Sequence, residues 1–250
     1  MSLLNTTSIR PRGSEPLKLY VVFGFLVTVF ASNSKDDDVD PPMLPFPLPR
    51  RTPGFVFNGG KSNAAIHLSA FLDLTCADSK RVWPMIKKLA NKYGPTKIRL
   101  TVHFFALAYF DNAFRALKSV FTVAAYNSSL LFPWVDDVFK NQDQLKNSAR
   151  TSTMSPEDIF KMKTCVIQIA RVITQMAIRA GILSRVMSDG LRSHDIESEA
   201  RMAWKFACSK VVMGTPTFFL NDIFIGGDAS SNWGEKQWNG MIDKILSGLN

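Results

Sequence analysis

The sequence predicts an α/β domain that follows an N-terminal extension, and three observations support this fold class. Apolar stretches at 66–74 and 98–105 are typical of buried strands, and the helical segment between them makes a βαβ unit with parallel strands. Between 112 and 192 the apolar residues recur at helical spacing, without a clear strand pattern. A strand hairpin at 217–225 and a closing helix at 233–249 complete the chain.

The N-terminal extension predicts a signal peptide over residues 1–31. Leu19–Ala31 is a nearly uninterrupted apolar run with basic residues before it, and it is shorter than the ~20 apolar residues of a spanning helix. Small residues at its end favour cleavage after Ala31, and an uncleaved signal-anchor is the alternative. Residues 32–53 are acidic and then proline-rich, which indicates an extended linker before the domain at 54–250.

Composition and charge exclude several classes of function. The 250 residues are 46% hydrophobic, enough for one sizeable core, and the formal net charge is +9. The basic residues are spread among acidic ones without interleaved aromatics, so no nucleic-acid partner is expected. The three histidines and three cysteines show no metal-ligand spacing and no Cys-x-x-Cys pair. We therefore expect neither a metal, another cofactor nor a disulfide framework.

The candidate active site is the junction where the strand at 66–74 leads into Cys76. Thr75 is the expected N-cap of the following helix, and Asp78 lies in its first turn. Cys76 is then at the positive end of the helix, where backbone NH groups and the helix dipole stabilise a thiolate. This placement is typical of a reactive thiol.

Two motifs carry a resemblance to a known family. Cys76-Ala-Asp-Ser79 follows a strand, and Met213-Gly-Thr-Pro-Thr217 precedes one far downstream. Together they resemble the DsbA-like branch of the thioredoxin superfamily, and within it the eukaryotic secreted-type members that have Cys-x-x-Ser in place of Cys-x-x-Cys. The resemblance extends over roughly 54–249.

The resemblance implies a fold and a set of site residues. The fold is a thioredoxin-like, DsbA-like α/β fold with a helical insertion at about 112–192. The peptide between Thr215 and Pro216 is expected to be cis and to lie beside Cys76. The implied catalytic residues are Cys76, Ser79, Thr215 and Pro216.

Two functions of different classes follow, and the sequence leaves open whether the protein is an enzyme. Ser79 cannot resolve a mixed disulfide as a second thiol would, although its hydroxyl can hydrogen-bond a Cys76 thiolate. The first function is a secretory-pathway thiol-disulfide oxidoreductase or isomerase-like protein that uses a single cysteine. Its partners are protein or peptide thiols and disulfides, and glutathione. The alternative is a non-catalytic thioredoxin-fold binding or chaperone-like module, which a buried Cys76 would favour.

The other cysteines and one histidine have structural interpretations. Cys165 and Cys208 lie on expected helices with apolar neighbours, and Cys165 is interpreted as a small buried hydrophobe. Cys208 comes shortly before Pro216 and is a candidate resolving thiol for Cys76. His103 lies inside the strand at 98–105 and is interpreted as a packed rather than a catalytic residue.

Asn127-Ser-Ser is an N-glycosylation sequon. Together with the signal segment, it predicts a glycoprotein of the endoplasmic reticulum lumen or the extracellular space. Contact with a membrane is expected only if the signal segment stays uncleaved and tethers the protein.

Overall fold

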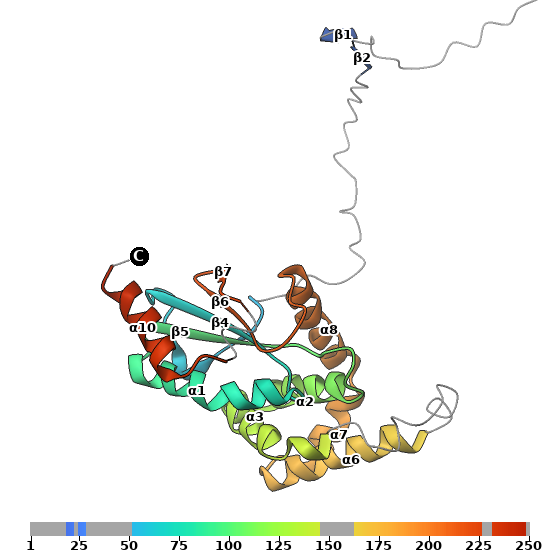
Figure 1. Ribbon diagram of the computed structural model, residues 1–250. Helices are drawn as coiled ribbons and strands as arrows, with labels where there is room; N and C mark the ends of the chain where they lie inside the picture. The colour runs from blue at the N-terminus through green and yellow to red at the C-terminus, as the bar shows by residue number, and fades with distance from the viewer. Residues whose placement is uncertain (1–18, 23–24, 29–51, 146–162, 227–231, 249–250) are drawn as a thin grey trace, which may run out of the picture. The chain divides into compact units, whose positions relative to one another are not determined.

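The computed structural model describes residues 19–22, 25–28, 52–145, 163–226 and 232–248 (Figure 1). The chain divides into two compact units, residues 1–48 and 49–250. The described part of the first unit is an antiparallel hairpin of β1 (Leu19–Val22) and β2 (Phe25–Thr28). The rest of the predicted signal segment, and nearly all of the predicted linker, lie outside the described residues. No described helix combines the length and the apolar character that a membrane span requires.

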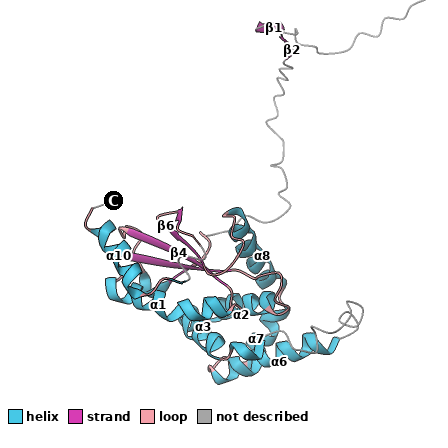
Figure 2. Ribbon diagram, in the orientation of Figure 1, coloured by secondary structure: helices cyan, strands magenta, loops and turns pink. Residues whose placement is uncertain are grey.

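A five-stranded mixed sheet forms the centre of the second unit (Figure 2). Its strands are β3 (Phe55–Val56), β4 (Ile66–Leu72), β5 (Ile98–Phe104), β6 (Thr217–Leu220) and β7 (Ile223–Phe224). They lie in the order β3-β5-β4-β6-β7; β4 and β5 are parallel, and the other neighbouring pairs are antiparallel. The predicted parallel strand pair and the predicted C-terminal hairpin are therefore both confirmed.

Seven α-helices lie in the described part of the chain. α1 (Ala77–Tyr93) connects β4 to β5, and α10 (Glu235–Leu246) follows the last strand. The other five lie between β5 and β6: α2 (Ala113–Tyr126), α3 (Leu131–Lys140), α6 (Lys163–Arg179), α7 (Ser184–Arg192) and α8 (His194–Ser209). The helices α2 to α7 form the predicted helical insertion.

Side chains that alternate along the strands build a hydrophobic cluster on each face of the sheet. Ala70 and Leu72 of β4 belong to the main cluster, which α1 and α10 cover. Phe71, between them, points to the other face and stacks against Phe206 of α8 with ring centroids 6.1 Å apart. This second, smaller cluster contains Cys76. The thiol thus lies on the face of the sheet that α8 covers.

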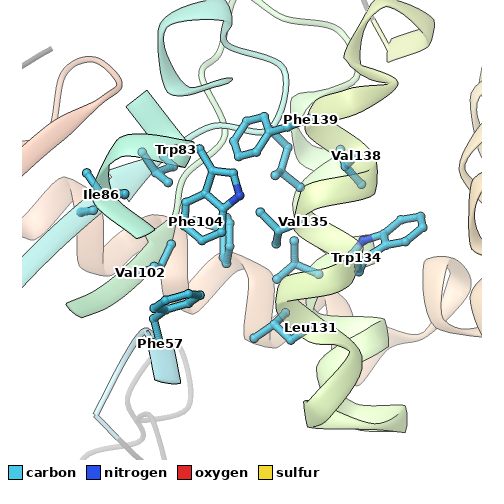
Figure 3. Close-up of a cluster of buried hydrophobic side chains, with 14 of the residues drawn as sticks. Phe57, Trp83, Ile86, Val102, Phe104, Leu131, Trp134, Val135, Val138 and Phe139 are labelled. Carbon is cyan, nitrogen blue, oxygen red and sulfur yellow. The ribbon is translucent and has the colours of Figure 1, made fainter. Parts of the chain in front are cut away.

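Aromatic packing fixes α1 against the helical insertion (Figure 3). Trp83 of α1 lies 6.0 Å from Phe132 and 6.1 Å from Phe139 of α3, measured between ring centroids. Its indole Nε1 also donates a hydrogen bond of 2.5 Å to the carboxylate of Asp136. Since Cys76 directly precedes α1, this packing also sets the position of the thiol.

Candidate thiol site

Cys76 is the N-cap residue of α1, which begins at Ala77. The predicted cap at Thr75 is wrong, because the amide and the hydroxyl of Thr75 both donate to Oδ1 of Asp73 at 2.6 Å. The Cys76 side chain makes no capping hydrogen bond with the helix, and Asp78 lies in the first turn as predicted. The thiol remains at the helix N-terminus, where the dipole favours a negative charge.

The thiol contacts the loop that leads into β6. The peptide bond between Thr215 and Pro216 is cis. The Cys76 thiol donates a hydrogen bond of 3.2 Å to the carbonyl oxygen of Thr215, although the two residues are 139 positions apart. The hydroxyl of Thr217 donates to the carbonyl oxygen of Gly214 at 2.7 Å and closes the same turn. The structure therefore brings Cys76, Thr215 and Pro216 together.

Ser79 lies in the first turn of α1 and is fully buried. Its Oγ accepts a hydrogen bond of 3.2 Å from the backbone NH of Asp73. Within the described part of the chain, no hydrogen bond joins this hydroxyl to Cys76. The Ser79 hydroxyl thus stabilises the junction between β4 and α1.

Cys76 itself is only 7% exposed. It packs in the smaller cluster with Leu107 and Val212. Close to these two in the chain are three exposed apolar side chains, Tyr109, Val211 and Met213, with exposed fractions of 65%, 74% and 86%. We call these three residues the apolar rim. Burial raises the pKa of Tyr109.

Asp73 is a buried carboxylate that joins the two segments on either side of the thiol. Besides the Oδ1 contacts with Thr75, its Oδ2 accepts a hydrogen bond of 2.7 Å from the backbone NH of Leu107. Burial raises the pKa of Asp73, and the hydrogen bonds from Thr75 and Leu107 only partly oppose this effect. The carboxylate thereby fixes the loop after β5 to the end of β4.

Gln142 is a second buried polar residue of the site, which the sequence did not predict. It lies in a short 3-10 helix, Gln142–Leu145, of the helical insertion and is 1% exposed. Its Nε2 donates hydrogen bonds of 2.9 Å to the carbonyl oxygens of both Leu74 and Cys76. The insertion therefore fixes the backbone on both sides of Thr75. A single glutamine in a polar stretch gave no signal of this role.

The other two cysteines and His103 make none of the hydrogen bonds described above. Cys76 and Cys208 are both free, and Cys208 is exposed on α8. Cys165 is in α6, and its side chain lies outside the described residues. His103 is 7% exposed and stacks on Phe71 with ring centroids 4.5 Å apart, so the packed interpretation is confirmed. Burial, helped by the charge of Lys210, lowers the pKa of His103 to about 4.

The glycosylation sequon lies away from the thiol, at the end of α2. Asn127 is exposed at the end of α2, and its side-chain oxygen accepts hydrogen bonds from the amide and the hydroxyl of Ser129 at 3.0 and 2.7 Å. Among the described residues, no group of three or more histidine, cysteine, aspartate or glutamate side chains could hold a metal ion.

Comparisons with known proteins agree on the fold. BdbD from Bacillus subtilis, in its oxidised form, is 16% identical, with 75% of this chain and 91% of that chain covered and a TM-score of 0.56. The thiol-disulfide exchange protein alpha-DsbA2 from Wolbachia pipientis is 18% identical, with 75% of this chain and 85% of that chain covered and a TM-score of 0.53. A periplasmic thioredoxin-like protein from Salmonella enterica serovar Typhimurium is 16% identical, with 75% of this chain and 88% of that chain covered and a TM-score of 0.51. At these identities the likeness shows the fold alone.

These neighbours and the observed sheet and helices confirm the predicted thioredoxin-like, DsbA-like fold with a helical insertion. No curated protein sequence matches the chain. A family model described as thioredoxin matches residues 55–244, from β3 into α10. Since this match spans most of the chain, the protein belongs to the thioredoxin family.

Proposed function

We propose that this protein performs thiol-disulfide exchange in the secretory pathway with Cys76 as its single reactive thiol. The observation that carries the proposal is the position of that thiol. It lies at the N-terminus of α1 and in hydrogen-bond contact with Thr215, the residue before the cis proline. One structure with this fold, from Wolbachia pipientis, is described as a thiol-disulfide exchange protein.

The chemistry has two exchange steps. The Cys76 thiolate attacks one sulfur of a partner disulfide; a bond forms between Cys76 and the partner, the partner's own disulfide breaks, and the departing sulfur takes up a proton. A second thiol, from the partner or from glutathione, then attacks the mixed disulfide and restores Cys76. Ser79 has no thiol and its hydroxyl is bound to the backbone of Asp73, so it cannot perform the second step.

Attack also requires a local rearrangement at the thiol. The carbonyl oxygen of Thr215 accepts a hydrogen bond from the neutral Cys76 thiol, whereas it would repel a thiolate. The 7% exposure of Cys76 leaves little room for a partner sulfur. In the reactive state the thiol must therefore move away from Thr215 and toward solvent.

The second candidate function is a non-catalytic binding module, and the burial of Cys76 is the observation that favours it. In that function the apolar rim of Tyr109, Val211 and Met213 would contact an extended or unfolded polypeptide directly. Cys76 would then be a packed side chain of the smaller hydrophobic cluster. The rim suits a polypeptide partner in both functions.

The cellular location is part of the proposal. The apolar run Leu19–Ala31 and the exposed Asn127 sequon support a eukaryotic secreted-type protein of the endoplasmic reticulum lumen or the extracellular space. One structure with this fold, from Salmonella enterica, is described as periplasmic, which is also a compartment outside the cytoplasm. An uncleaved signal segment would instead tether the protein to the membrane.

The test is to trap the mixed disulfide and to locate it. Wild type, Cys76→Ser and Cys208→Ser would be incubated with glutathione disulfide or a disulfide-bonded peptide, then digested and mapped by mass spectrometry without reduction. We expect a mixed disulfide on Cys76 in wild type and in Cys208→Ser, and with glutathione disulfide we expect it to persist until a thiol is added. Equal labelling of Cys76→Ser would contradict the proposal. A disulfide between Cys76 and another cysteine of the chain, in place of the mixed disulfide, would contradict the single-cysteine mechanism.

A further inference from the structure

A cavity that takes no part in the thiol site lies between the helical insertion and α8. Its volume is about 890 Å³, and α2, α6, α7 and α8 contribute its walls. Ligand cavities in proteins commonly have volumes of about 300–1,000 Å³. We call it the insertion cavity. A smaller cavity of about 410 Å³, lined by the loop after β5 and by α8, shares only Phe114 and Arg201 with it.

The lining of the insertion cavity is strongly basic. Five basic residues and one acidic residue line it: Arg115, Lys118, Arg171, Arg192, Arg201 and Glu197. Arg192 pairs with Asp189 at 3.1 Å, a residue outside the lining. Arg115 and Arg171 form no ion pair with any residue in the described ranges. Two cations on facing helices, α2 and α6, are thus available to an anion in the cavity.

One carboxylate, that of Glu197, holds Lys118 and Arg201 in place. Glu197 accepts hydrogen bonds from Arg201 at 2.7 Å and from the buried Lys118 at 3.2 Å. These hydrogen bonds lower the pKa of Glu197, so that its charge is kept. Arg201 also lies over the ring of Phe114, 5.4 Å from the centroid. This side of the cavity is therefore fixed before any ligand arrives, which reduces the entropy cost of binding.

Apolar surface lies beside the charges. Phe114, Ala170 and Leu191 line the same cavity, together with the aliphatic stems of the basic side chains. A small inorganic anion would leave this apolar surface in contact with water. A neutral apolar molecule would leave Arg115 and Arg171 without an anion. A ligand that combines an anionic head group with an apolar body matches both parts of the lining.

We propose that the insertion cavity binds an amphipathic organic anion. Arg115 and Arg171 hold its carboxylate or phosphate head group by charge-assisted hydrogen bonds. Its aliphatic body packs against Phe114, Ala170 and Leu191. This binding site is independent of Cys76, and it holds for either function considered above.

The experiment measures the affinity of the full-length chain by isothermal titration calorimetry for four probes: octanoate, octyl phosphate, 1-octanol and inorganic phosphate. The test variant is Arg115→Gln/Arg171→Gln. The matched control is Arg179→Gln/Arg185→Gln, which removes the same charge from exposed positions of α6 and α7 outside the cavity. Circular dichroism would check that both double variants remain folded. A further variant, Ala170→Trp, fills the cavity without changing its charge.

We expect wild type to bind at least one of the two octyl anions about tenfold more tightly than 1-octanol or inorganic phosphate, since only these probes use both parts of the lining. The test variant and Ala170→Trp should each lose about tenfold in that affinity, and the control should bind like wild type. The preference between octanoate and octyl phosphate identifies the head group. Equal binding of 1-octanol, equal binding of inorganic phosphate, or an unchanged affinity in the test variant would overturn the proposal.

Discussion

Two backbone carbonyl groups beside the thiol, those of Leu74 and Cys76, accept hydrogen bonds from the side chain of Gln142. In Gln142→Ala the Cys76 oxygen still accepts from the backbone NH of Lys80 at 3.1 Å, but the buried Leu74 oxygen loses this donor, and an unsatisfied buried polar group costs about 1–3 kcal/mol. We therefore expect Gln142→Ala to lower the free energy of unfolding in urea by about 1–3 kcal/mol. The freed loop should also make Cys76 alkylate faster under native conditions.

The exposed neighbour Gln144 provides the control for that prediction. Within the described residues its side chain hydrogen-bonds to the side chain of Asn141 alone, at 3.3 Å, so Gln144→Ala should change stability by no more than about 0.5 kcal/mol. If Gln142→Ala were as mild as Gln144→Ala in both measurements, Gln142 would have no role in holding the thiol loop.

His103 makes a second prediction at the scale of a single residue, and this one concerns pH. Its folded pKa is lowered to about 4 by burial, against 6.5 for the unperturbed side chain. Between these values the unfolded chain binds a proton that the folded protein does not, so stability falls as the pH is lowered. We expect wild type to lose up to about 3 kcal/mol relative to His103→Phe between pH ~6.5 and ~4.

Urea unfolding of both proteins across that pH range measures the difference. The phenyl ring should fit between Phe71 and Phe206, which already lie 4.5 and 5.1 Å from the His103 ring. Asp73 is present in both proteins, so the opposite pH effect of its raised pKa cancels in the comparison. If the free energies of unfolding of the two proteins changed in parallel with pH, His103 would have an ordinary pKa in the folded state.

At the scale of elements, the packing of α7 on α2 depends on Gly190. A Cβ atom at this position would lie 2.2 Å from Cγ2 and 2.4 Å from Oγ1 of Thr122, far inside van der Waals contact. We expect Gly190→Ala to destabilise the protein by about 1–3 kcal/mol in thermal or urea unfolding, the usual cost of an overpacked interior.

A second helical glycine, Gly240, provides a control that shows the effect of a glycine-to-alanine change without a steric clash. Gly240 lies in α10, and a Cβ atom there would have no neighbouring atom within 4 Å, so Gly240→Ala should be neutral or stabilising by up to about 1 kcal/mol. Combining Gly190→Ala with Thr122→Ala should give a smaller loss than the two single changes added together. If the losses in free energy of unfolding were strictly additive, the effect of Gly190→Ala would not arise from contact with Thr122.

The elements themselves were largely predictable from local patterns. Apolar runs marked β4 and β5, and the residues Asn221 and Asp222 marked the β6–β7 hairpin, where both have positive φ angles of 46° and 64°. Helical spacing marked the insertion. The cap of α1 was misplaced by one residue, because Thr75 could bond either to the helix or to Asp73, and only the folded geometry decides between them.

At the scale of the whole molecule, contacts between distant segments were only partly predictable. The contact of Cys76 with the Thr215–Pro216 loop was predicted from the family resemblance, because the family's two motifs lie far apart in sequence but close together in the fold. The contact of Gln142 with Cys76 joins segments 66 positions apart and has no motif. The burial of the thiol depends on side chains from several loops, and no pattern within one segment encodes it.

Entry into the secretory pathway is a further prediction for the whole chain. Expressed in eukaryotic cells, the protein should lose its N-terminal segment and gain a mass that an endoglycosidase removes, because the Asn127 sequon is exposed. Asn127→Gln and Ser129→Ala should each abolish the added mass, whereas Ser128→Ala keeps the sequon and should keep the mass. A full-length, unglycosylated wild-type product would contradict this prediction.

If Cys76 performs thiol-disulfide exchange, its thiol must be reactive in the folded protein, which the alkylation rate as a function of pH would reveal. Each cysteine would be followed separately by peptide mass mapping, with the exposed Cys208 as an internal reference. We expect Cys76 to be alkylated faster than global unfolding allows, at a rate that rises with pH as the thiolate forms. Labelling of Cys76 only at the rate of global unfolding, while Cys208 reacts freely, would contradict the exchange function and leave the binding module.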